Sequence, residues 1–183
     1  YNFDSVEEDP EIPVVLVFVT RHILHAKENY QPGPEVLFMR RGFLVGALQG
    51  QWSPIAGVDD LHMPDNPEEA TRQVVLAELE DEAGITDLAG EVTYFGKNHY
   101  PDPRKPGRTY VQQLFHVQAN YGSVVVDWEN IGSIWVPISA VAEYLETGLT
   151  DNPHMSVVID DGTTMIEDGN LARFKDYFSR TYR

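Results

Sequence analysis

The chain has 183 residues, and its 13 lysines and arginines stand against 29 aspartates and glutamates, which gives a formal net charge of −16 at pH 7. This length suits one domain with a real core, and an apolar content of 42% excludes the composition of a disordered chain. The absence of cysteine excludes disulfides, a thiol nucleophile and Cys-ligated zinc, and it fits the cytoplasm. The charge disfavours a nucleic-acid partner, and the longest apolar run, 13–19, is too short for a membrane span.

The N-terminal part of the chain predicts the first strands of a sheet. Residues 1–11 are polar and acidic, so we expect a tail there and one domain over 12–183. Continuous β-branched residues predict a strand over 13–20 that is covered on both faces. A second strand is expected over 35–40, and a short extended segment over 50–57.

A helix is expected over Pro67–Ala83, because both of its ends carry signals. Asn66 serves as N-cap, Pro67 occupies the first helical position, Glu69 completes a capping box, and Gly84 is the stop. At about 100° per residue, four apolar side chains form a stripe that must face a core. These residues are Val75, Leu76, Leu79 and Ala83.

The C-terminal half mixes strands and helices without a regular alternation. Strands are expected over 91–96, 109–118, 123–126 and 133–137, a loop over 97–108, and helices over 138–145 and 170–182. This mixture predicts the α+β class.

Three acids stand near the end of the predicted helix. Glu78, Asp81 and Glu82 have i, i+3 and i+4 spacing, and Arg72, the base of this helix, is too far away to pair with them. Like charges at this spacing cost roughly 0.2–0.5 kcal/mol per pair, and anions in a last turn oppose the helix dipole by roughly 0.3–1 kcal/mol each. A solvated acidic face would bear these costs, whereas Mg²⁺ or Mn²⁺ would reverse them, because hard cations prefer oxygen ligands.

The segment 57–85 resembles the Nudix box, G-x5-E-x7-R-E-U-x-E-E-x-G-U, in which U is aliphatic. Six residues fall on box positions, with an Asp in place of one Glu: Glu78, Leu79, Asp81, Glu82, Gly84 and Ile85. Two features depart from the pattern. Ala77 stands where the family has Arg, and eleven residues rather than five separate Gly57 from Glu69, unless Asp65 replaces the early Glu.

Segments outside the box are also similar to the family. Residues 52–57 look like the W-x-x-P-G-G strand that enters the box, 36–41 look like the early strand that often ends in a base, and 129–137 look like the later E-x5-W-x-P segment. The resemblance covers about residues 12–146 and leaves the last 37 residues unexplained.

This resemblance implies a Nudix-type α/β/α sandwich with a mixed central sheet, and metal-assisted hydrolysis of a nucleoside diphosphate linked to a group X. Glu78 and Glu82, with Asp81, would then hold Mg²⁺ or Mn²⁺ as the catalytic acids, and the Gly57 carbonyl would complete the coordination. The cation would bridge the diphosphate and bring a water molecule toward ionisation. Glu129 is implied as a base or further ligand, and an ordinary loop acid is the alternative.

A concentration of bases predicts where substrate phosphates bind. Four of the 13 bases lie within twelve residues, at Lys97, Arg104, Lys105 and Arg108. With Tyr110 beside it, this cluster predicts a phosphate clamp with a ring face for a nucleobase, and a solvated loop is the alternative. Arg40 and Arg41, at the end of a predicted strand, are a second candidate pair for substrate binding.

Within this resemblance, a nucleoside triphosphate pyrophosphohydrolase is the leading hypothesis. A hydrolase of ADP-ribose or of a dinucleoside polyphosphate is the alternative, and a sensor of the same fold that binds a nucleotide without turnover belongs to a different class. In the family, the box Arg is thought to hold the early Glu, so Ala77 predicts metal binding with slow turnover. No basic helix-turn-helix pattern points to DNA, and a homodimer is left open.

Overall fold

The structure, a computed structural model, describes residues 11–23, 32–43, 49–59, 67–120, 124–125 and 130–182, with only the backbone described for 67–70. The strands are β1 (Glu11–Ile23), β2 (Gly33–Arg41), β3 (Trp52–Ser53), β4 (Ile55–Val58), β5 (Thr93–Pro101), β6 (Thr109–Gln118) and β7 (Asn130–Pro137). The helices are α1 (Pro67–Ala83), α2 (Ile138–Thr147), α3 (Pro153–Asp161), α4 (Thr164–Glu167) and α5 (Asn170–Thr181).

The strands form one mixed sheet around β1. Its order is β3-β2-β1-β6-β5, while β4 also pairs with β1 and β7 with β2. The β1–β6 pair is parallel over ten residue pairs, and the other pairs are antiparallel. The β-branched run of β1 occupies the centre, where both faces of a strand are covered.

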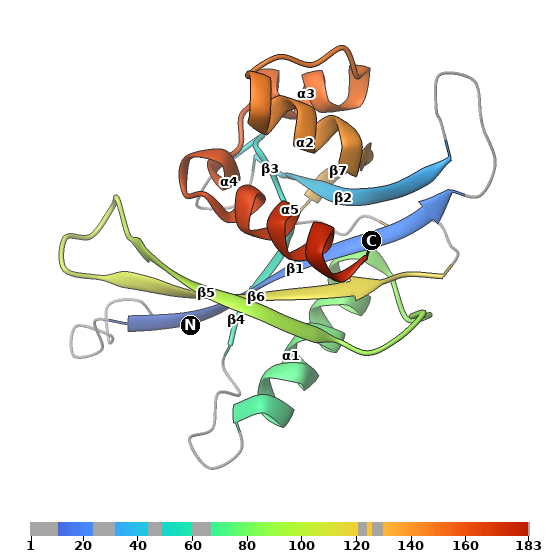
Figure 1. Ribbon diagram of the computed structural model, residues 1–183. Helices are drawn as coiled ribbons and strands as arrows, with labels where there is room; N and C mark the ends of the chain where they lie inside the picture. The colour runs from blue at the N-terminus through green and yellow to red at the C-terminus, as the bar shows by residue number, and fades with distance from the viewer. Residues whose placement is uncertain are drawn as a thin grey trace.

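Helices cover both faces of the sheet, with α1 on one side and α2–α5 on the other (Figure 1). Side chains alternate along each strand, so neighbouring residues enter different cores. Val15 and Val17 belong to the core that contains Val75 and Leu79 of α1, which we call the α1 face. Leu16, Phe18, Val36 and Phe38 belong to the core under α2–α5, the opposite face. The predicted α/β/α sandwich with a mixed sheet is thereby confirmed.

The C-terminal helices close the opposite face. Phe174 of α5 stacks on Phe18 with ring centroids 4.7 Å apart. His116, which is 1% exposed, joins three elements: its Nε2 lies 2.7 Å from Oγ1 of Thr20 on β1, and its Nδ1 lies 3.1 Å from the hydroxyl of Tyr177 on α5. Burial lowers the pKa of His116 to about 4, so the ring is neutral near pH 7.

Several predicted elements match, and others need correction. The bounds of α1 and β6 agree with the predictions, whereas β5 continues to Pro101, so Lys97 lies in a strand and not in a loop. β5 is longer than predicted because it pairs with β6 as far as Pro101. Since β5 is an edge strand, the missing N–H of Pro101 breaks no hydrogen bond to a further strand. Of the strand expected over 123–126, the structure describes Val124 and Val125, and neither is in a strand. Instead, the amide of Val125 donates to the carbonyl of Ala83 at the end of α1.

The apolar stripe of α1 is rotated relative to the prediction. Leu76 is 39% exposed, while Val74 is buried in the core with Val75 and Leu79. The helix turns its Thr71 side toward the sheet, where the Thr71 hydroxyl donates to Asp59 at 3.0 Å.

The helices α3 and α4 were not among the predicted elements. The side chain of Asn152 caps α3 by accepting from the amides of His154 and Met155, and Thr163 caps α4 in the same manner. None of the described helices combines the length and the apolar character that crossing a membrane requires.

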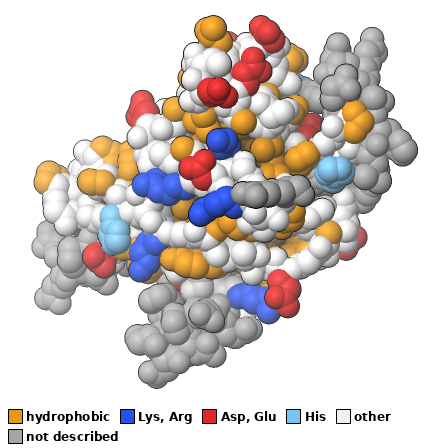
Figure 2. Space-filling model, in the orientation of Figure 1, with side chains coloured by type: hydrophobic (Ala, Val, Ile, Leu, Met, Phe, Trp, Pro, Cys, Tyr) orange, Lys and Arg blue, Asp and Glu red, His pale blue; other side chains and the backbone are white. Residues whose placement is uncertain are grey.

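Charged side chains of both signs are visible on one side of the molecule (Figure 2). Lysine and arginine side chains form a band over α5 and β5, and acidic side chains gather above it over α2 and α3.

Candidate functional site

The centre of the candidate site is the contact between Gly57 on β4 and Glu78 on α1. A Cβ atom on Gly57 would stand 2.5 Å from Oε1 and 2.8 Å from Cγ of Glu78, with Cδ nearer still. Real Cβ atoms do not tolerate such distances, so Gly57 leaves the space that the Glu78 carboxyl group fills. The structure therefore brings the Glu78 carboxylate against the backbone at Gly57, and the coordination of a cation by these two residues stays a prediction.

The other two acids of the helix have different environments. Glu82, one turn beyond Glu78, is 6% exposed, whereas Asp81 is exposed to solvent. Gly84 ends the helix with φ +65°, and its amide donates to the carbonyl of Glu80. The last turn of α1 contains no base. Its acids therefore lie at the negative end of the helix dipole, where negative charge is unfavourable.

Asp59 is a buried acid of this region that was not singled out from the sequence. Its Oδ2 accepts from the hydroxyl of Thr71 and from Nε2 of Gln113, both at 3.0 Å. Its amide donates to the carbonyl of Pro13 at 2.8 Å. The signal in the sequence is an acid placed two residues after Gly57, but its partner Gln113 is 54 residues away.

These residues offer oxygen ligands suited to a hard divalent cation. Within the described ranges, no group of three or more Asp, Glu, His or Cys side chains is close enough to share an ion. The candidate oxygen ligands on α1 are the carboxylates of Glu78 and Glu82, which are one turn apart. The backbone at Gly57 lies against the Glu78 carboxylate. Mg²⁺ is commonly bound by one or two carboxylates plus waters and substrate phosphates, so the donor set fits such an ion.

Arg40 lies on the opposite face of the sheet from Glu78. Its Nε donates to the carbonyl of Gly50 at 3.0 Å, and its Nη2 is 3.6 Å from Oδ2 of Asp161 on α3. Trp52 donates to the same oxygen at 2.9 Å. Arg41 bonds through its backbone to Gln51, beyond a register shift in β2. The structure therefore does not bring Arg40 together with the acids of α1, and its role in substrate binding stays a prediction.

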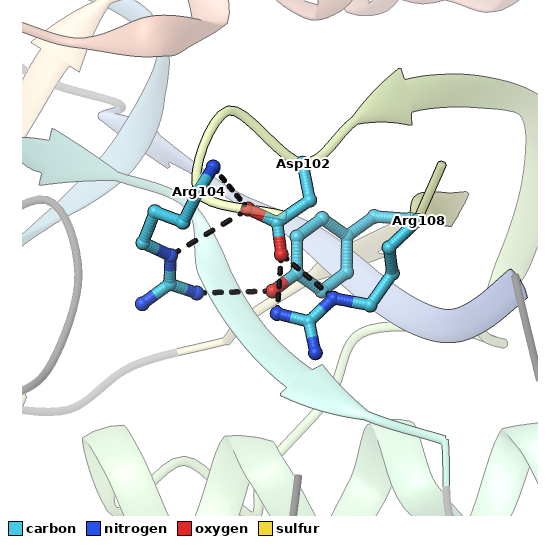
Figure 3. A network of polar contacts seen from close by, with 4 residues as sticks. Asp102, Arg104 and Arg108 are labelled. Carbon is cyan, nitrogen blue, oxygen red and sulfur yellow. Dashed lines mark hydrogen bonds and ion pairs between the residues drawn. The ribbon is translucent and has the colours of Figure 1, made fainter. Parts of the chain in front are cut away.

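The β5–β6 hairpin holds the other predicted substrate contacts around one carboxylate (Figure 3). Asp102, with a side chain that is 0% exposed, pairs with the guanidinium of Arg108 and accepts from the amide of Arg104 at 2.9 Å. The side chain of Arg104 is 51% exposed and donates to the Tyr110 hydroxyl at 3.1 Å. Arg104 also pairs with Asp102, since its Nε lies 3.5 Å from Oδ1. Arg108 is thus the enclosed member of this ion-pair network, and Arg104 is its solvent-exposed member.

The charges of this hairpin stabilise each other. Burial alone would raise the pKa of Asp102, but the bonds from the Arg104 amide and the Arg108 guanidinium outweigh it and hold this pKa below its ordinary value. The hydrogen bond to Asp102 raises the pKa of Arg108. Both groups are therefore charged near neutral pH.

A pocket of about 270 Å³ lies away from Glu78, on the opposite face of the sheet. Residues of α2 and α3, the segment 162–167 and Gln51 line it. Since the acids of α1 are on the other side of the sheet, this pocket is not part of the candidate site.

The side chains of three predicted site residues lie outside the part of the chain that the structure describes. Glu129 and Asp65 lie outside the described residues, and for Glu69 only the backbone is described. Their expected roles stay predictions.

Comparisons with known proteins support the fold. No protein-family model matches the sequence, and a search of curated proteins finds no match. Among solved structures, the MutT protein from Methanosarcina mazei Go1 is 21% identical with a TM-score of 0.56, over 94% of each chain. An Ap4A hydrolase from C. elegans is 16% identical with a TM-score of 0.56, over 92% of this chain and 98% of that one.

The Nudix domain of Shewanella oneidensis NrtR, solved with ADP ribose, is 14% identical with a TM-score of 0.52, over 86% of this chain and 89% of that chain. At these identities the likeness establishes the fold. The chain has the Nudix fold, in agreement with the resemblance of its sequence.

Proposed function

We propose that this protein hydrolyses a nucleoside diphosphate linked to another group, with Mg²⁺ or Mn²⁺ as cofactor. The leading substrate class is a nucleoside triphosphate, which would be split into a monophosphate and pyrophosphate. The single observation that carries this proposal is the Glu78 carboxyl group held against Gly57, on a helix whose last turn has acids and no base.

The electrostatics of α1 support a cation at this place. Glu78 and Glu82 are one turn apart on α1, so their like charges repel each other, and a cation bound by both would relieve this repulsion. When bound, the cation supplies charge neutralisation of the diphosphate and a water of lowered pKa. The residues of this chain then have two tasks, which are to hold that ion through Glu78 and Glu82 and to keep the backbone at Gly57 within reach of it.

The β5–β6 hairpin is the proposed phosphate contact. Arg104 extends from this hairpin with half of its side chain exposed, next to Tyr110. Arg108 pairs with Asp102 inside the hairpin. Its proposed role is to hold the hairpin in shape, so that Arg104 rather than Arg108 contacts the phosphate. A small nucleotide is thus the expected partner, and the chain's charge of −16 disfavours a nucleic acid. We also place the activity in the cytoplasm, in keeping with the cysteine-free sequence.

An ADP-ribose or dinucleoside polyphosphate substrate is the second candidate. It is favoured by two structural neighbours, one solved with ADP ribose and one named as an Ap4A hydrolase. All three substrates present a diphosphate to the same acids and differ in the group beyond it.

A panel of nucleotides tests the proposal. Nucleoside triphosphates, ADP-ribose and dinucleoside polyphosphates are incubated with Mg²⁺ or Mn²⁺, and product release is compared with that in a chelator. We expect metal-dependent cleavage that is lost in Glu78→Gln and kept in Glu80→Gln, because Glu80 is an exposed acid of the same last turn. Tight nucleotide binding without any turnover would contradict an enzyme and favour a sensor.

A further inference from the structure

Asp59 connects the strand of the candidate site to the helix of the candidate site. It follows β4 directly and is 2% exposed. One of its carboxylate oxygens accepts hydrogen bonds from Thr71 on α1 and Gln113 on β6, and its amide bonds to Pro13 on β1. A single side chain therefore links α1 to the central part of the sheet.

The position of this link matters for Glu78. Thr71 precedes Glu78 by seven residues, which is about two turns, so both side chains project from nearly the same side of α1. Gly57 precedes Asp59 by two residues, a spacing that places both on the same face along an extended segment. The Asp59–Thr71 bond and the Glu78–Gly57 contact are thus two parallel connections between the same pair of segments.

The two connections depend on each other geometrically. The Glu78 carboxyl group fits beside Gly57 with no space for even a methyl group, so a small rotation or shift of α1 would move this carboxyl group away from the backbone. The side chain of Ala77, in contrast, has no polar atom with which to link the helix to the preceding segment. Thr71 and Asp59 supply a link of this kind within the described residues.

We propose that Asp59 is a positioning residue, which acts through Thr71 and Gln113 to set the rotation and distance of α1 at which Glu78 lies against Gly57. This inference rests on the proposed function for its consequence in catalysis. An enzyme whose metal-binding carboxyl group is loosely held has a lower reaction rate even when every ligand is present. Loss of the Asp59–Thr71 bond should therefore lower kcat more than it changes KM.

Substitutions of Thr71 test this proposal without removing the buried acid. Thr71→Val keeps the shape of the side chain and removes the donor, while Thr71→Ser keeps the donor. Thr20→Val is the matched control, because it removes a buried hydroxyl that bonds to His116 on the opposite face of the sheet. Each variant is measured for kcat, KM, the Mn²⁺-induced rise in Tm, and amide hydrogen exchange over residues 55–59.

We expect Thr71→Val to lower kcat at least tenfold with KM within about threefold of wild type, to reduce the Mn²⁺-induced rise in Tm, and to speed exchange over residues 55–59. Thr71→Ser should restore most of each loss. Thr20→Val should lower Tm without changing kcat or this exchange. A Thr71→Val protein with wild-type kcat and exchange overturns the proposal, as does an equal loss of kcat in Thr20→Val, which would indicate a general loss of stability.

The exchange measurement separates this inference from the proposed function. If the wild type cleaves no nucleotide in any metal, the proposed function fails. Faster exchange over residues 55–59 in Thr71→Val alone would still support the positioning link, and unchanged exchange would overturn it.

Discussion

The carboxyl group of Glu78 occupies the place that a side chain on residue 57 would fill. This contact joins α1 to β4, and β4 is in turn paired with β1, where Gly57 is opposite Val15. The acid is therefore held by a rigid part of the sheet, which favours a site of fixed geometry.

Substitution of Gly57 by Ala should disrupt this contact. The added methyl group forces Glu78 or β4 to move, and overpacking of this kind costs about 1–3 kcal/mol. We expect a lower Tm and no response to Mn²⁺ in thermal unfolding. Gly132→Ala is the control, because a Cβ there would meet its nearest neighbours at an ordinary 3.7 Å. A Gly57→Ala protein that responds to Mn²⁺ like the wild type would argue against the contact.

The two arginines of the β5–β6 hairpin should behave differently when replaced. Arg108→Ala removes the guanidinium that pairs with the buried Asp102 and leaves this carboxylate with Arg104 alone, so we expect a clear loss of stability. Arg104→Ala removes a half-exposed charge, so we expect an unchanged fold and a KM several fold higher. Chemical denaturation and steady-state kinetics distinguish the two effects.

A double variant controls for the ion pair. Replacing Asp102 by Asn and Arg108 by Met should cost less stability than Arg108→Ala alone, because no charge stays buried. If instead Arg108→Ala is as stable as the wild type and only KM rises, Arg108 is a direct substrate contact.

The stability of the protein should depend on pH through His116. Its pKa is about 4 in the folded protein, against an ordinary value of 6.5, so between these values the unfolded chain binds more protons than the folded chain. The free energy of unfolding therefore rises with pH from about 4 to 6.5, and this contribution is lost as the pH falls through that window. The difference corresponds to roughly 3 kcal/mol.

Urea unfolding at a series of pH values measures this slope. In His116→Gln the rise between pH 4 and 6.5 should be absent, so the difference in stability between the two proteins should change by roughly 3 kcal/mol across this window. A wild-type stability that is constant between pH 6.5 and 4.5 would show that His116 does not titrate in this way.

Much of the fold follows from local signals in the sequence. The bounds of α1 are predictable because Asn66 and Pro67 mark its start and Gly84 its stop, and the strand predicted over 109–118 has the bounds of β6. The same Asn-Pro signal occurs at Asn152 and Pro153, where it begins α3. Local reasoning could therefore have found that helix as well.

The remaining features depend on contacts between distant residues. A base in a segment rich in Pro and Gly is expected to be solvated, yet hairpin formation buries Arg108 against Asp102. The partners of Asp59 come from two other elements, and Arg40 is held by Asp161, which is more than a hundred residues away. Sequence patterns report periodicity and capping, whereas these pairs are created only by the folded sheet.

The cap of α3 provides a further test of the C-terminal segment. Asn152→Ala removes the acceptor for the amides of His154 and Met155, and loss of such a cap costs about 1 kcal/mol. We expect a small decrease in Tm with unchanged activity, since α3 covers the face opposite Glu78. A loss of activity beyond this change in stability would connect α3 to the site.

The most direct test of the central claim is the response of Tm to Mn²⁺ in the wild type and in the Glu78→Gln, Glu82→Gln double variant. An ion at 100 times its Kd stabilises the folded state by about 2.7 kcal/mol, or roughly 5–10 °C for a domain of this size. We predict this rise in the wild type and in the Glu80→Gln control, and its absence in the double variant. An equal rise in the double variant would contradict a cation site at Glu78 and Glu82.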